Sequence, residues 1–259
     1  MMSMARVNWP GTLFLLGVGL VWEAFARVYG SPNFPAFSQV VSALVTNREA
    51  ITVDTLYTLK RACLGFAIAL VTMLPLGLLL GRVRLLGDIV EPVIELVRPL
   101  PPIAVVPVAL LFLGTGDEAR IAVVAFGCAF PILINTIDAV RGAHPMLTNV
   151  ARALRLSKAE QMVFVDLPAA LPQIMAGMRI SVALAILLAV VAEMLLSSNG
   201  LGTFIVRAQE RFQIANGLAG IIVIAALALA INAVLRRIDE HLLAWHHART
   251  GTGLAARGE

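Results

Sequence analysis

Long apolar runs restrict the fold of this chain to structures that a lipid bilayer can hold. Leu184–Leu196 and Gly217–Leu235 contain one acidic residue between them and neither Lys nor Arg. A membrane-spanning helix needs about 20 predominantly apolar residues, whereas a spanning barrel needs segments of about ten residues with alternating polarity. Because lipid offers the backbone no hydrogen-bond partner, continuous runs must satisfy their N–H and C=O groups internally. The sequence therefore predicts transmembrane helices.

The composition supports a membrane protein over a soluble one. Hydrophobic residues make up 59% of the 259 residues and charged residues 14%, with a mean hydropathy of +0.87. Soluble domains average about 45–50% apolar and about 25% charged residues. The net charge of +4 is spread along the chain rather than gathered in a basic tract, which argues against a nucleic-acid partner. Cys63 and Cys128 lie in separate apolar runs and are expected to be small buried hydrophobes.

Six segments have the length and apolarity of a spanning helix. We therefore expect an all-α integral membrane protein with about six transmembrane helices, forming one domain over residues 1–259. The expected spans are Trp9–Tyr29, Thr55–Gly81, Glu91–Leu113, Ala119–Val140, Leu171–Leu196 and Gly217–Leu235. The intervals Ser31–Asn47 and Ser197–Asn216 are expected to be loops that each carry a short amphipathic helix.

The first apolar segment has two interpretations, a cleaved signal peptide or a retained membrane anchor. Ala24-Phe25-Ala26 is similar to a signal-peptidase site, and Arg6 precedes the apolar run. However, Trp22 and Glu23 stand where a cleavage region would be, and the run is long for a signal peptide. These features favour a retained membrane anchor.

The distribution of Lys and Arg predicts the orientation of the chain. If the N-terminus is cytoplasmic, thirteen of the 20 Lys and Arg residues fall on inner segments and seven on outer ones. Cytoplasmic loops carry the excess of positive charge. We therefore expect both termini in the cytoplasm, and Arg141–Asp166 as the main cytoplasmic loop.

The third expected span is unusual because it holds five prolines. Proline removes a backbone donor and bends a helix, and broken helices in transporters line substrate cavities. The cluster is either a hinge or a packed kink, and we favour a role in lining a pathway. Candidate pathway residues are Arg98, Pro99, Pro101, Pro102, Pro107 and Glu193.

Two of these candidates have a structural alternative. Arg98 lies one helical turn from Glu95 and forms either a local ion pair, the favoured reading, or part of a pathway. Glu193 is either a cavity or gate residue, or a carboxylate at the level of the lipid headgroups.

The motifs that the chain lacks narrow its function to transport. It contains no GxxxxGK[ST] phosphate loop, no HExxH and no GxSxG motif, and it shows no constellation of catalytic groups. An autonomous secondary transporter is one alternative, but it predicts inverted repeats and acids near the midplane that are not evident. An intramembrane enzyme is the other, disfavoured by the missing catalytic groups.

The loop before the fifth span has a distinctive pattern. From Asn149 it reads NVARALRLSKAEQ, followed by MVFV and an Asp-Leu-Pro ending at Pro168. This pattern predicts a short helix, a Ser-Lys turn, a second short helix and a Leu-Pro punctuation before the membrane helix. It resembles the cytoplasmic "EAA" loop in permease subunits of binding-protein-dependent ABC importers. That loop reads Glu-Ala-Ala, a three-residue gap and Gly, and ends further on in Leu-Pro.

The resemblance has two departures. Val150 and Ala151 fall on the two alanines, but Asn149 replaces the family's Glu and Arg155 its Gly. If the Gly position is left-handed, an Arg there costs about 1–2 kcal/mol. In that case the turn is built differently, or Ser157 carries it. The coupling segment implied by the resemblance comprises Asn149, Val150, Ala151, Arg152, Ala153, Leu154, Arg155, Leu156, Ser157, Leu167 and Pro168.

Further motifs extend the resemblance over residues 55–243. Arg98 to Ala104, Leu111 to Gly114, Phe130-Pro131-Ile132, Ala192-Glu193-Met194 and Gly200-Leu201-Gly202 look like the nitrate, sulfonate, taurine and bicarbonate branch of the family. This implies a type I ABC importer permease-like fold in a bacterial inner membrane, with residues 141–168 as the coupling loop. It also implies a second copy of the chain, two ATPase subunits that hold ATP and Mg, and a periplasmic or lipid-anchored binding protein. The chain itself would hold no cofactor or metal and would carry a small anion.

Overall fold

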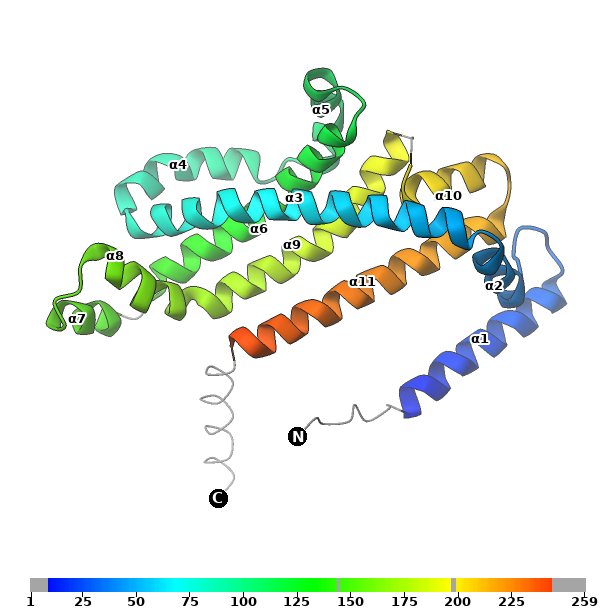
Figure 1. The fold of residues 1–259 in the computed structure, drawn as a ribbon, viewed down its shortest axis with the longest axis horizontal. Helices are drawn as coiled ribbons and strands as arrows, with labels where there is room; N and C mark the ends of the chain where they lie inside the picture. Colours follow the sequence, from blue (N-terminus) through cyan, green and yellow to red (C-terminus); the bar gives the residue numbers. More distant parts are fainter. Residues whose placement is uncertain (1–8, 144, 197–198, 244–259) are drawn as a thin grey trace.

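The computed structural model describes residues 9–143, 145–196 and 199–243, and the regular structure in these residues is helical (Figure 1). In chain order the elements are α1 Trp9–Tyr29, α2 Phe37–Thr46, α3 Arg48–Arg82, α4 Arg84–Val97, η1 Pro102–Val105, α5 Val106–Leu113, α6 Asp117–Arg141, α7 Pro145–Ala153, α8 Lys158–Gln161, η2 Met162–Asp166, α9 Leu167–Leu195, α10 Leu201–Glu210 and α11 Ile214–Leu242.

The membrane fold expected from the apolar runs is confirmed. Among the described residues, four helical stretches are long and apolar enough to cross a membrane: α3, α6, η2 with α9, and α11. The bent pair of α4 with η1 and α5 makes a fifth if it is counted as one span. The count is therefore four to five rather than about six. α1 has the bounds of the first predicted span but is not one of these four, and it packs on α2, where Trp22 Nε1 donates to the Pro35 carbonyl at 3.1 Å.

The third predicted span is broken, which the proline cluster explains. α4 ends at Val97, and the chain bends by 87° before it continues as η1 and α5. Pro99 and Pro101 lie in the bend, and Pro102 begins η1, where a missing N–H costs nothing. The bend makes α5 project from the bundle, where it packs on the start of α6 (Figure 1).

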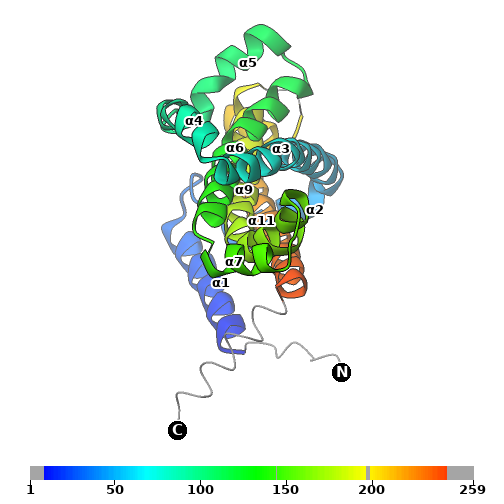
Figure 2. The same cartoon turned by 90° about the vertical axis from the view of Figure 1, so that its left-hand side faces the viewer.

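The core of the molecule is made by α3, α6 and α9, which cluster together when the molecule is viewed end on (Figure 2). Glycines on α3 permit close packing on α6. A Cβ on Gly65 would lie 2.5 Å from Val124 Cγ1, and one on Gly77 would lie 2.7 Å from Thr136 Cβ. Small residues at such contacts let helix backbones approach closely where no hydrophobic effect drives association.

The short helices expected in the loops are present. α2 follows the Pro-containing loop, and α10 lies between the last two long helices. The loop after α6 contains α7, a turn and α8, in the predicted order. α8 then continues through η2 into α9, with Pro168 in the first turn of α9.

Candidate functional site: a protruding loop and a cavity at a broken helix

The turn after α7 is a Schellman motif with Arg155 at its left-handed position. The Leu156 N–H donates to the Ala151 carbonyl and the Arg155 N–H to the Arg152 carbonyl, both at 3.0 Å. Arg155 has a φ of 53°, in the region that glycine occupies without strain. The resemblance placed Arg155 at the Gly of the EAA pattern, and the turn was expected to be built differently or carried by Ser157; the structure instead keeps the left-handed conformation at Arg155. Ser157 does not carry the turn.

Ser157 instead begins α8 with a capping box. Its N–H donates to Glu160 Oε2 at 2.8 Å, and the Glu160 N–H donates to Ser157 Oγ at 3.3 Å. Hydrogen bonds from the Ser157 side chain and backbone hold the pKa of the Glu160 carboxyl below its usual value. The two ends of the turn between α7 and α8 are therefore fixed by local hydrogen bonds, which gives the loop a defined shape.

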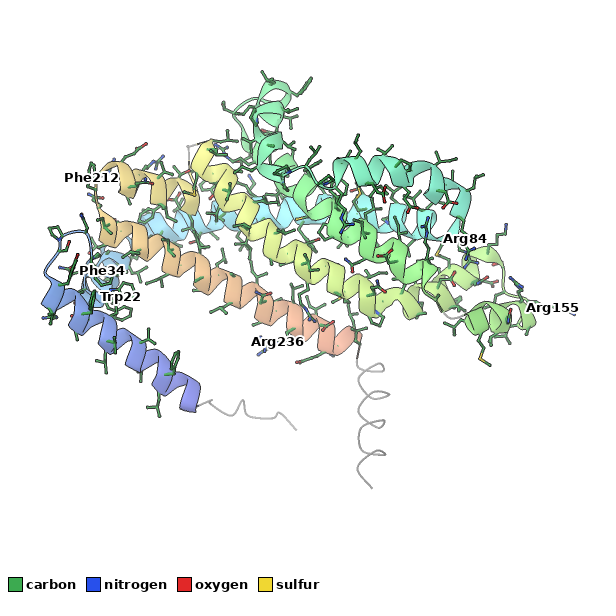
Figure 3. The ribbon with its side chains drawn as sticks, turned by 180° about the vertical axis from the view of Figure 1, so that it is seen from behind. Trp22, Phe34, Arg84, Arg155, Phe212 and Arg236 are labelled. Carbon is green, nitrogen blue, oxygen red and sulfur yellow. The ribbon has the colours of Figure 1, made fainter. Side chains whose placement is uncertain are left out.

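An ion pair ties the base of the loop to the bundle. Asp166, at the end of η2, is buried and pairs with Arg82, the last residue of α3. Leu167 and Pro168 follow directly and are partly buried. The loop is therefore anchored at the Leu-Pro end, while its tip at Arg155 is exposed (Figure 3).

One face of α7 presents apolar side chains outward. Met146, Val150 and Leu154 recur every four residues and are 66%, 48% and 66% exposed. Ala153 is also exposed. Ala151, from the predicted coupling segment, is only 1% exposed within this chain. α7 turns this side chain inward, and the outward face is the Met146–Val150–Leu154 stripe.

A cavity of about 460 Å³ lies behind the loop. Its lining comes from the ends of α3 and α6, from the start of α4, and from α7, α8 and η2. Asn149 and Arg152 from the predicted coupling segment face it. These two side chains therefore line the space between the loop and the bundle, unlike the apolar stripe.

A second cavity, of about 380 Å³, lies at the broken helix. Its lining residues are Arg98, Leu100, Pro102, Gly127, Phe130, Pro131, Ile134, Asn135, Ile180 and Leu184. The walls are mostly apolar, with Arg98 as the cation and the Asn135 amide as a polar group. Of the predicted pathway residues, the structure places Arg98 and Pro102 in this lining, while Pro99, Pro101 and Pro107 are exposed on the bend and on α5.

Arg98 also faces a smaller cavity of about 200 Å³ that Glu91, Glu95 and Asp138 share. In the described part of the chain no ion pair joins Glu95 to Arg98, so the favoured local pairing is wrong. Arg98 therefore lines both a cavity with three acidic residues and a mostly apolar one.

At the other end of α3, Glu193 lies in a buried ion pair. Arg61 NH1 is 2.8 Å from Glu193 Oε1, and both side chains are 0% exposed. The Glu193 carboxylate also accepts from Thr58 Oγ1 at 2.9 Å and from the Gly202 N–H at 3.1 Å. A carboxylate with this set of donors is satisfied without a ligand. Glu193 is absent from the linings of the cavities described above, and its place on a pathway stays a prediction.

The buried pair belongs to a network that the sequence reasoning missed. Arg61 also binds Asp117 Oδ1 through Nε at 2.9 Å and the Asn199 carbonyl at 2.8 Å. The network therefore joins α3, α6, α9 and the segment before α10. Arg61 was the sequence feature that could have predicted this network, because an ionisable group inside a spanning helix requires a partner at the same depth.

Comparisons with known proteins agree with this architecture. Residues 73–245 match the family described as binding-protein-dependent transport system inner membrane component. The chain is 30% identical to the taurine transport system permease protein TauC of Escherichia coli, over 91% of this chain and 88% of that protein. It is 34% identical to the bicarbonate transport system permease protein CmpB of Synechococcus elongatus, over 73% and 69%. Inward-facing structures of the MetNI methionine ABC transporter include a chain with a TM-score of 0.67 and 19% identity, over 76% of this chain and 98% of that one.

Proposed function

The chain belongs to the family of binding-protein-dependent transport system inner membrane components. From this membership we propose which steps of import the chain performs and which its partner subunits perform. It is a multi-pass membrane protein and a permease subunit of an ABC importer. We propose that it forms the passage for a small anion, while ATP and Mg²⁺ bind to separate ATPase subunits. One observation supports separate roles for the permease and the ATPase subunits: the anchored loop has an exposed apolar stripe at its tip.

The loop has the properties of a mechanical contact. Its turn is fixed by a Schellman motif and its second helix by a capping box, so it can transmit a displacement without collapsing. The Met146–Val150–Leu154 stripe offers an apolar surface for a groove on an ATPase subunit. Arg82 and Asp166 connect the loop to α3, so a push on α7 would reach the bundle. We place this loop, and both termini, in the cytoplasm on the Lys and Arg distribution.

A second copy of the chain would complete the passage. Leu111 and Phe112 on α5 are each 83% exposed, and α5 projects from the bundle beside the cavity at the broken helix. A homodimer with two ATPase subunits and a substrate-binding protein on the outer side fits this arrangement. The cavity at Arg98 would then face the passage from each copy.

We infer an anionic solute from the chemistry of that cavity. A guanidinium beside mostly apolar walls favours a small oxyanion, which accepts charge-assisted hydrogen bonds in a site with little water. The names of the two relatives specify taurine, which carries a sulfonate group, and bicarbonate. We therefore propose a sulfonate, bicarbonate or nitrate-like solute.

Reconstitution tests the proposal. The chain is placed in vesicles alone, and in parallel with its co-purified ATPase subunits and binding protein. We expect uptake of labelled taurine, bicarbonate or nitrate only in the complete system and only with ATP. Uptake by the chain alone down an ion gradient would instead support an autonomous secondary transporter and reject the division of work proposed here.

A further inference from the structure

The cavity behind the loop is unusually rich in cations. Four arginines line it: Arg82, Arg84, Arg141 and Arg152. They come from the ends of α3 and α6, the start of α4, and α7. Figure 3 shows Arg84 beside the part of the loop that carries α8. Elements far apart in sequence therefore direct guanidinium groups to one space of about 460 Å³.

The acidic groups nearby do not balance these charges. Among the described residues that line the cavity, Asp166 is the one carboxylate, and it pairs with Arg82. Arg141 is 3.5 Å from Asp88 and 3.3 Å from Glu91, two exposed acids outside the cavity lining, and such exposed pairs contribute little. Within the part of the chain that the structure describes, Arg84 and Arg152 have no ion pair. The cavity therefore carries an excess of positive charge.

Gln161 provides a second and independent observation. It lines the same cavity, is only 7% exposed, and its Nε2 has no hydrogen-bond partner within the described residues. A buried donor without a partner destabilises the fold unless a ligand satisfies it. An amide N–H can be satisfied by an acceptor, and an anion is the acceptor that the surrounding arginines would also attract. The orphan donor and the charge excess point to the same class of ligand.

We propose that this cavity binds a small oxyanion, such as sulfate, phosphate or the phosphate of a lipid headgroup. The planar guanidinium of arginine binds two oxygens of such groups through paired hydrogen bonds. The bound oxyanion would accept from Arg84, Arg152 and Gln161 Nε2, and would join the ends of α3 and α6 to the loop. The site is separate from the cavity at Arg98, and it is not needed for the solute to cross.

Anion binding to the full-length chain in nanodiscs tests this site. Sulfate is titrated at constant ionic strength in nanodiscs of phosphatidylcholine, and binding is followed by calorimetry. A second arm measures retention of phosphatidylglycerol by native mass spectrometry. Saturable sulfate binding identifies a soluble oxyanion, and selective retention of phosphatidylglycerol identifies a headgroup. Either result supports the site if the variants below weaken it.

Anion binding by three variants tests whether the cavity behind the loop is the binding site. Asn149→Glu places a carboxylate in the lining from an exposed position and should weaken binding at least tenfold without affecting folding. Arg152→Gln should do the same, and its unfolding temperature without anion should match that of the unmodified chain. Arg236→Gln removes the same charge from exposed α11 and should leave binding unchanged. Absence of saturable binding in both arms, or equal weakening by Arg152→Gln and Arg236→Gln, would overturn the proposal.

Discussion

Arg61 and Glu193 are 132 residues apart in the sequence, yet their charged groups meet at 2.8 Å with both side chains fully buried. Removing Arg61 leaves the buried Glu193 carboxylate without its cation, which costs about 3–5 kcal/mol. We therefore expect Arg61→Leu to destabilise the protein by about that amount, and Glu193→Leu by less, because Arg61 keeps its ion pair with Asp117. The measurement is unfolding of the detergent-purified protein, followed by the exposure of Cys128 to a thiol reagent.

The double variant separates pairing from general damage. Arg61→Leu with Glu193→Leu removes both charges, so its loss should be clearly smaller than the sum of the two single losses. Glu49→Gln, an exposed acid in the first turn of α3, should change stability by less than about 0.5 kcal/mol. Additive losses in the double variant would show that the two residues do not act as a pair.

Local patterns predicted much of the fold. Apolar runs located the long helices, and the prolines between Arg98 and Pro107 marked the broken span. The turn at Arg155 was left open by the sequence, and the structure shows that Arg155 adopts the left-handed conformation itself. Contacts between distant segments were not predictable in the same way. The pairing of Arg61 with Glu193 depends on how α3 and α9 are rotated, and hydropathy does not encode that rotation.

The outward face of α7 could not be predicted from the sequence for a related reason. Small side chains such as Ala151 suit a close contact, but they suit an internal contact as well as an external one. Packing of α7 on η2 turns Ala151 inward, while Met146 and Val150 point outward. Only the tertiary arrangement distinguishes the two surfaces of such a short helix.

The left-handed Arg155 offers a direct test of the loop turn. Arg155→Gly removes a strain of about 1–2 kcal/mol but adds freedom to the unfolded chain, so we expect a net gain of about 0.5–1 kcal/mol. Hydrogen exchange at the Leu156 amide, which donates to Ala151, should slow by a matching factor of roughly 2–5. Arg155→Val should have the opposite effect, since a β-branched residue tolerates this region worst. Unchanged exchange in both variants would contradict the turn.

The apolar stripe on α7 is expected to carry the contact with the ATPase subunit. Val150→Asp would bury an unpaired carboxylate in that contact and should weaken co-purification of the ATPase by more than about 2 kcal/mol, roughly 30-fold. Membrane insertion should be unaffected, because Val150 lies outside the spanning helices. Arg155→Gln keeps the turn residue unbranched and should change assembly by less than about 1 kcal/mol. Full assembly of the Val150→Asp variant would exclude this stripe as the contact.

The orientation is testable with single cysteines. After Cys63→Ser and Cys128→Ala, we expect Arg207→Cys to react with an impermeant reagent in intact cells and Arg152→Cys to react only after lysis. Both native side chains are exposed, so labelling reports the side of the membrane rather than burial. Replacing Cys63 matters because it is exposed, so the expectation that both cysteines are buried is confirmed for Cys128 and wrong for Cys63. Labelling of Arg152→Cys from outside would reverse the orientation.

Arg98 is expected to act on the solute itself. A hydrogen bond to a charged group contributes about 1.5–3 kcal/mol, so Arg98→Gln should lower anion uptake on the order of 10- to 100-fold. Arg98→Lys keeps the charge but loses the planar donors, and we expect it to retain an intermediate rate.

Assembly with the ATPase subunit is the measurement that distinguishes a pathway role of Arg98 from a structural role. Arg98 is exposed and has no ion pair to Glu95 in the described residues, so its loss should leave ATPase co-purification and the unfolding temperature unchanged. Arg237→Gln removes a charge from exposed α11 and should leave uptake unchanged. If Arg98→Gln transports at the unmodified rate, the cavity at the broken helix is not part of the anion passage. If it fails to assemble, Arg98 supports the fold or the dimer rather than the solute.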